Sequence, residues 1–115
     1  MTYKHINLDY LNMISDGDDA TRQMLLEMVY NELTTVVPAM EQAYQAGNWS
    51  EFHGIVHKLK STLAFAGNPE LTLANQNILT NLEEEKFEID YSPWLSVFQR
   101  LSGDVLEELN REIGS

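Results

Sequence analysis

Residues 52–67 have the sequence FHGIVHKLKSTLAFAG, and this stretch decides the fold because its apolar residues recur three or four positions apart. Such spacing predicts a helix with one buried stripe, and Gly67 is typical of a residue that ends a helix. The residues of the predicted buried stripe are Phe52, Val56, Leu59, Leu63 and Ala66.

The flank of this helix carries the polar residues whose side chains are able to take part in binding or in a reaction. At about 100° per residue, the flank lies roughly 80–140° from the centre of the apolar stripe, so its side chains border solvent without pointing directly away from the bundle. The residues on the flank are His53, His57, Lys60 and Ala64, with Ser61 next to them. Because Ser61 and Ala64 are small, little shields the His57 ring from an approaching partner.

Apolar residues elsewhere also follow helical spacing, and no segment alternates as a strand does. We expect a short leading helix over residues 6–14, a long tract over 25–44, a helix starting at Asn68-Pro69 and a last helix starting at Ser92-Pro93. The expected buried positions of these elements are Leu25, Met28, Val29, Leu33, Val36, Met40, Tyr44, Leu71, Ala74, Ile78, Leu82, Trp94, Phe98, Leu101, Val105 and Leu109.

Two residues inside the predicted helices are unfavourable there. Pro38 removes a backbone donor and clashes with the preceding turn, so we expect a kink or a break. Gly103 costs about 1 kcal/mol relative to alanine inside a helix, which suggests a close packing contact at that point. The pattern as a whole predicts an all-α protein: an antiparallel four-helix bundle with a short N-terminal helix, forming one domain over residues 1–115.

Composition excludes several functions. The net charge of −11 repels phosphate backbones and anionic lipids, which argues against binding nucleic acid or a membrane surface. There is no cysteine, no apolar run of the roughly 20 residues that span a bilayer, no signal-peptide pattern and no phosphate-binding glycine loop. We therefore expect a cytoplasmic location and another protein as the partner.

The residues alone leave three interpretations of His57 open. It is an ordinary surface histidine, a group with a function shared with Lys60, or a metal ligand together with His53 four positions earlier. Metal binding is the least favoured of these, because the flank offers no third ligand and Lys60 repels a cation. His5 belongs to no motif in the sequence.

Around His57 the chain resembles a histidine-containing phosphotransfer (HPt) domain of multistep two-component signalling. The family signature is a histidine, any residue, an aliphatic residue, a lysine and small residues, with a glycine about ten positions after the histidine. This sequence has HKLKSTLA at 57–64 and then Gly67, and further landmarks of the family precede it in order at 8–9, 17–18, 24–29, 38 and 46–49. The resemblance covers residues 6–86, and the last helix matches only by type.

The resemblance implies a role for each flank residue. His57 would accept a phosphoryl group from a receiver-domain phosphoaspartate and pass it to another receiver aspartate, while Lys60 compensates the phosphoryl charge. His53, Ser61 and Ala64 would contact the partner, which would be a response-regulator receiver domain or a hybrid sensor histidine kinase. The chain would be a monomeric phosphocarrier and not an enzyme, without metal or cofactor of its own, and Mg²⁺ would sit on the receiver.

The sequence departs from the family at two places. Ser61 stands where glycine is common, and the phosphate-contacting glutamine of many members falls at Leu79, with Gln76 and Asn75 one turn earlier. The sequence does not assign that contact to any residue. Phe65 either packs on the leading helix, which we favour, or forms an apolar part of the docking surface.

Two other classes of protein compete with the phosphocarrier. The first is a helical docking module that regulates a receiver or sensor kinase without carrying phosphate. The second is part of a histidine kinase, in which a comparable helix dimerises and precedes an ATP-binding domain. The sequence contains no such domain and no linker at either end, so we expect a free-standing module.

Overall fold

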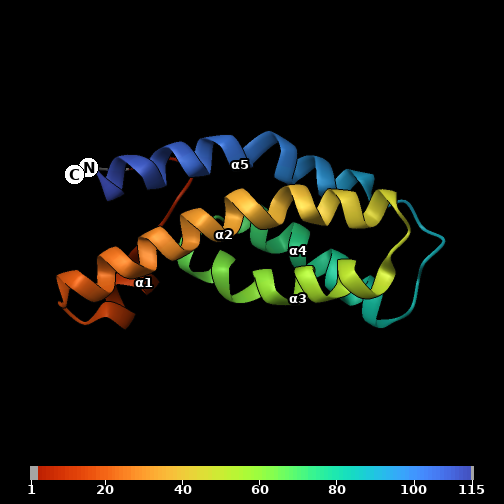
Figure 1. Cartoon of the computed structure of the whole chain (residues 1–115), viewed down its shortest axis with the longest axis horizontal. Helices are drawn as coiled ribbons and strands as arrows, with labels where there is room; N and C mark the ends of the chain where they lie inside the picture. Colours follow the sequence, from red (N-terminus) through yellow and green to blue (C-terminus); the bar gives the residue numbers. More distant parts are fainter. Residues whose placement is uncertain (1–2, 115) are drawn as a thin grey trace.

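A computed structural model describes residues 3–114, which form five helices and no strand. The four long helices pack side by side as an antiparallel bundle of about 45 × 23 × 20 Å, and the short first helix lies across one end (Figure 1). The helices are α1 (Asp9–Ser15), α2 (Asp19–Gln45), α3 (Trp49–Ala66), α4 (Pro69–Glu83) and α5 (Ser92–Ile113). The predicted four-helix bundle with a short N-terminal helix is therefore confirmed, although the first helix begins at Asp9 and not at residue 6.

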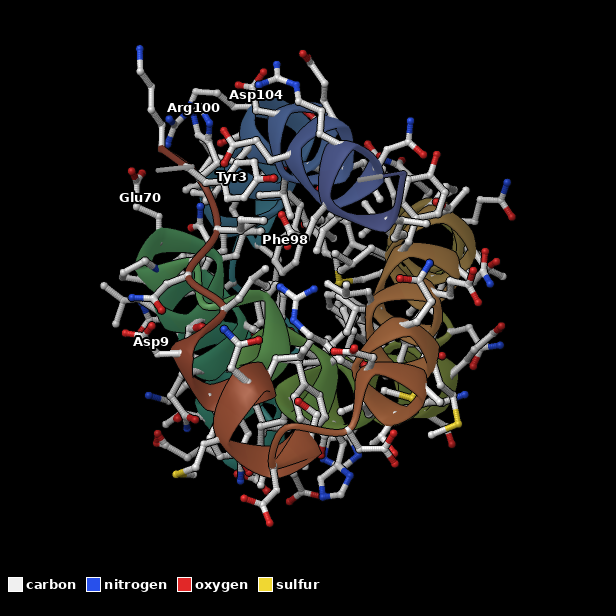
Figure 2. All side chains as sticks on the ribbon, turned by 90° about the vertical axis from the view of Figure 1, so that its left-hand side faces the viewer. Tyr3, Asp9, Glu70, Phe98, Arg100 and Asp104 are labelled. Carbon is white, nitrogen blue, oxygen red and sulfur yellow. The ribbon has the colours of Figure 1, made fainter. Side chains whose placement is uncertain are left out.

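The core of the bundle is made by the apolar stripes of the four long helices. All five residues of the stripe predicted for α3 are fully buried, and Phe98 of α5 points into the space between the helices (Figure 2). Three predicted core positions are wrong. Met28 is exposed on α2. Tyr44 and Trp94 are only half-buried, because their neighbours Ala43 and Leu95 occupy the buried positions on α2 and α5.

We expected a kink or a break at Pro38, and of these the break does not occur, because the helix α2 continues through this residue. Proline has no amide hydrogen, and the carbonyl of Thr34 therefore lacks its usual partner one turn later. Because Pro38 is exposed, water can hydrate that carbonyl, and the buried residues Val36 and Met40 hold the helix on the core from both sides.

Polar side chains accept hydrogen bonds from backbone amides at the starts of the last two helices. The Asn68 side chain accepts a hydrogen bond from the Leu71 amide at 3.0 Å, which confirms the predicted start of α4. The start of α5 differs from the prediction, since Ser92 is the first helical residue and not the cap. The carboxylate of Asp90 accepts from the Ser92 amide at 2.9 Å and takes over that function.

Two glycines differ in what surrounds them. The expected close packing at Gly103 is wrong, because this residue is exposed and a methyl group there would meet no atom within 4 Å. Gly67 ends α3 in the left-handed conformation, with φ +67°, and its amide donates to the Leu63 carbonyl. A methyl group at Gly67 would lie 2.1 Å from the carbonyl oxygen of Asn7, so the chain needs glycine at this crossing.

The N-terminal segment, residues 3–8, runs from the C-terminal end of α5 to α1 and crosses the α3–α4 junction (Figure 1). The amide of Asn7 donates to the Ala66 carbonyl at 3.0 Å, and the Asn68 side chain donates to the His5 carbonyl at 2.8 Å. These bonds tie the segment to the junction and set the position of α1 beside α3.

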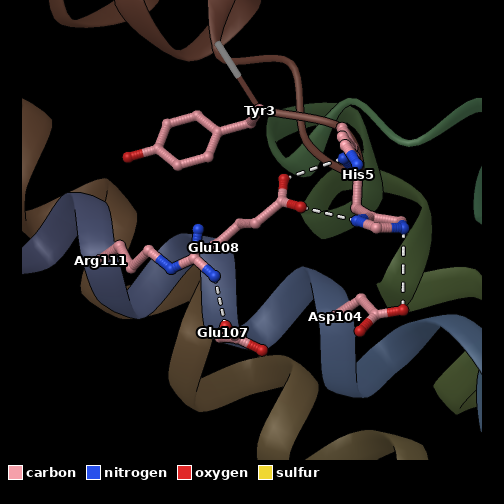
Figure 3. A pocket seen from close by; sticks show the side chains of 7 residues that line it. Tyr3, His5, Asp104, Glu107, Glu108 and Arg111 are labelled. Atoms are coloured by element: carbon pink, nitrogen blue, oxygen red, sulfur yellow. Dashed lines mark hydrogen bonds and ion pairs between the residues drawn. The ribbon is translucent and has the colours of Figure 1, made fainter. Parts of the chain in front are cut away.

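A buried carboxylate on α5 fastens the same segment (Figure 3). Glu108 accepts hydrogen bonds from the amides of His5 and Ile6, and its second oxygen lies 2.6 Å from the His5 ring, whose other nitrogen lies 3.7 Å from Asp104. Burial alone would raise the pKa of Glu108, but the hydrogen bonds from His5 and Ile6 outweigh it and hold the pKa below its ordinary value. His5, which belongs to no sequence motif, is thus an anchor of the fold.

Candidate functional site

The site is centred on His57, which lies in the middle of α3. Val56 and Leu59 on either side of it are fully buried, and they fix the rotation of the helix about its axis. With these two residues facing the core, the His57 ring is exposed, as the helical spacing predicts. Asn48 caps the start of α3 and Gly67 ends it, so His57 sits on a stable stretch of helix, away from its ends.

An open depression of about 470 Å³ surrounds the His57 ring. It brings together four of the five residues that the sequence places at the site, and adds two aromatic residues. The residues that line it are Tyr10, His57, Lys60, Ser61, Ala64 and Phe65. A depression of this shape on a helix flank leaves the imidazole accessible to a large partner.

His53 does not line this depression, but it lies next to His57. The two rings are 6.3 Å apart between centroids, with 33° between their planes, and His53 is half-buried. Within residues 3–114 no group of three or more histidine or acidic side chains is placed to hold a metal ion. The pair therefore stands as two adjacent imidazoles on one face of α3.

The two lysines near His57 differ in their partners. The ammonium group of Lys58 lies 3.4 Å from the carboxylate of Glu32 on α2, so its charge is engaged within the bundle. Lys60 forms no hydrogen bond or ion pair with any residue of the described range 3–114, and its side chain lines the depression. Lys60 is thus the cation that the site can offer to an incoming anion.

Phe65 packs on the leading helix, as we favoured. Its ring stacks on Tyr10 of α1, with 5.3 Å between centroids and 29° between planes. Tyr10 is the site residue that sequence reasoning missed, because nothing local shows that α1 lies across α3. The sequence offers only a weak indication, which is an aromatic residue on the polar side of a short helix. Tyr10 is 44% exposed in the structure.

The glutamine contact of the family has no counterpart at the expected position on α4. Leu79 is only 2% exposed and belongs to the core. Asn75 is buried as well, and its side chain donates to the Val56 carbonyl at 3.0 Å, which ties α4 to α3 behind His57. Gln76 is exposed and its amide donates to the Thr80 hydroxyl, and it lines a neighbouring groove that shares Ala64 with the site.

Large apolar side chains are exposed on α1 and on the first half of α2. One of them, Tyr10, also lines the His57 depression. The exposed apolar residues of these two helices are Tyr10, Met13, Ile14, Met24 and Met28.

Comparison with solved structures identifies the class to which this fold belongs. The chain is similar to the HPT domain from the Hpt sensor hybrid histidine kinase of Shewanella, with a TM-score of 0.70 and 17% sequence identity over 92% of this chain and 94% of that one. No protein-family model matches the sequence, and no curated protein matches it. The chain thus has the fold of a histidine-containing phosphotransfer domain.

No helix within residues 3–114 combines the length and the apolar character that crossing a membrane requires.

Proposed function

We propose that this chain is a phosphorelay carrier, in which His57 receives a phosphoryl group from a receiver-domain phosphoaspartate and passes it to another receiver aspartate. The observation that carries the proposal is an exposed imidazole on the α3 flank of an HPt-type bundle, with the unengaged cation Lys60 in the same depression. The HPt fold of the chain supports a role in two-component phosphotransfer.

The proposed step exchanges one bond to phosphorus for another. The lone pair of one His57 ring nitrogen attacks phosphorus, the bond from phosphorus to the aspartate oxygen breaks, and the carboxylate leaves. The proton on the other ring nitrogen stays with the imidazole during the step. Charge spreads over the phosphoryl oxygens as they transfer, and Lys60 compensates part of it.

The partner would supply the rest of the chemistry. The receiver or hybrid kinase would bring the second carboxylate and Mg²⁺, and this chain, a cytoplasmic monomer, would contribute the acceptor and a surface. His53 and the small residues Ser61 and Ala64 would border the contact. Tyr10, an exposed aromatic residue of α1 that lines the same depression, would add an apolar part to that surface.

The test is transfer of radioactive phosphate from receiver domains phosphorylated with labelled acetyl phosphate. We expect label on the chain that is stable in base and labile in acid, lost in His57→Gln and kept in the neighbouring control His53→Gln. Label that survives in His57→Gln would refute the assignment. Binding of receivers without any label would establish the alternative, a docking module that regulates a receiver or sensor kinase.

The role of Lys60 has a matched control in Lys58. We expect Lys60→Ala to slow transfer about tenfold, equivalent to about 1.4 kcal/mol of activation free energy, because the developing charge loses its cation. Lys58→Ala removes an equal charge that is engaged with Glu32, and transfer should stay within twofold of wild type. If the two substitutions slow transfer equally, Lys60 has no specific role in the mechanism and the effect comes from the change in net charge.

A further inference from the structure

Two residues that carry a hydroxyl group line the depression beside His57 and Lys60. They are Tyr10 on α1 and Ser61, one turn after His57 on α3. Neither hydroxyl forms a hydrogen bond with any residue in the described range 3–114. Each therefore has a donor available to a ligand at this place.

The composition of the depression selects an anion. Its polar groups are two hydroxyls, one ammonium and one imidazole, and no carboxylate lines it although the chain as a whole carries a net charge of −11. Hydroxyl and ammonium donors suit the oxygens of a phosphoryl group, which accept hydrogen bonds more strongly because they are charged. The depression thus lacks the acidic residues that dominate the charge of the chain as a whole.

Leu79, at the position on α4 where many members of the family have glutamine, is buried in the core, and Gln76 lines the neighbouring groove and not the depression. We propose that the hydroxyls of Tyr10 and Ser61 hydrogen-bond the phosphoryl group on His57, beside Lys60, and together provide the contacts that α4 does not. The inference rests on the proposed function, because it assumes that His57 carries the group. It makes Tyr10 and Ser61 phosphoryl-contacting residues and not merely small or apolar neighbours.

The fold places both residues at the site before any group arrives. The Tyr10 ring stacks on Phe65, and the next residue, Leu11, is fully buried and anchors α1 to the bundle. Ser61 is four residues after His57, a spacing that places two side chains on the same face of a helix about one turn apart. Donors already in place lose little entropy when they bind a ligand.

The experiment uses phosphoramidate, a small phosphoryl donor that reacts with imidazoles, so that the site is tested without any receiver. The rate at which His57 becomes phosphorylated is followed on phosphate-affinity gels, and the product by ³¹P NMR. We expect Tyr10→Phe and Ser61→Ala each to lower the rate about three- to tenfold, the range expected for loss of one hydrogen bond. Both should also move the ³¹P resonance of the phosphohistidine.

Each substitution has a control that separates the hydroxyl from the packing. Tyr10→Phe keeps the stacked ring, and Ser61→Thr keeps the hydroxyl and should lower the rate less than Ser61→Ala does. Tyr30→Phe and Ser50→Ala remove the same groups from residues outside the depression, and we expect no change in rate or resonance. Far-UV circular dichroism checks that every variant is folded.

The possible failures are distinguishable. A wild-type chain labelled to the same extent as His57→Gln would overturn the proposed function, and the hydroxyl contacts with it. A wild-type chain labelled at His57, with Tyr10→Phe and Ser61→Ala both within twofold of its rate and with an unmoved resonance, would overturn the hydroxyl contacts alone. The phosphocarrier function would then stand with Lys60 as the phosphoryl partner.

Discussion

Replacing Gly67 by alanine tests how the N-terminal segment is fixed to the bundle. The residue has φ +67°, and the left-handed conformation costs alanine about 1 kcal/mol relative to glycine. The new methyl group would also lie 2.1 Å from the carbonyl oxygen of Asn7, a backbone atom that can move only if the segment moves. That movement weakens the bond from the Asn7 amide to the Ala66 carbonyl, worth about 0.5–1.5 kcal/mol.

We therefore expect Gly67→Ala to lower the free energy of unfolding by about 1.5–2.5 kcal/mol, measured by urea unfolding followed by circular dichroism. Gly47→Ala is the matched control, because Gly47 has φ +69° and a methyl group there meets no atom within 4 Å. It should lose only the conformational part, about 1 kcal/mol. Equal losses in the two variants would refute the view that contact with Asn7 makes glycine necessary at position 67.

Two further predictions concern stability. Gly103→Ala should raise the free energy of unfolding in urea by about 0.5–1 kcal/mol, since the position is exposed and helical and the methyl group meets nothing; a loss would contradict this. The hydrogen bonds to Glu108 and Glu112 hold the pKa of each carboxyl group below its ordinary value. These bonds therefore stabilise the folded chain fully above the pKa of an unfolded glutamate, about 4.3, and this stabilisation is lost as the pH falls through the pKa values of the folded chain. Urea unfolding between about pH 7 and pH 3 should show this decline in the free energy of unfolding. Glu108→Gln should lower the free energy of unfolding by about 1.5–3 kcal/mol at pH 7 and make its decline with falling pH less steep. An unchanged dependence on pH would exclude Glu108 as a source of the decline.

Local features of this chain were predictable because their causes lie within a few residues. The stripe of α3 is buried as its spacing predicts, and Asn68 caps α4 because an asparagine side chain reaches the amide three residues later. The exposure of His57 follows from the same periodicity. The sequence is sufficient to predict a residue's burial or a helix cap when the interacting residues lie within about one turn of the same helix.

Other features depend on contacts between distant segments. The break expected at Pro38 is absent because the residue faces solvent and its neighbours face the core, a matter of helix placement. His5 contacts Glu108 across 103 positions of sequence, and no local pattern indicates that pairing. Tyr10 reaches the His57 depression for the same reason, since the crossing of α1 over α3 is set by the N-terminal segment.

The N-terminal segment therefore links the stability of the fold to the site. Residues 7–8 lead directly into α1, which carries Tyr10, so the shift that Gly67→Ala imposes on Asn7 should also displace the phenol. A double-mutant cycle measures this coupling in the phosphoramidate reaction, under conditions in which Gly67→Ala is folded. We expect the three- to tenfold effect of Tyr10→Phe to fall below about twofold in the Gly67→Ala background, because the hydroxyl no longer lies where it can act. If Tyr10→Phe lowers the rate by the same factor in the wild-type and Gly67→Ala backgrounds, the position of Tyr10 is set by its stacking on Phe65 alone and not by the N-terminal segment.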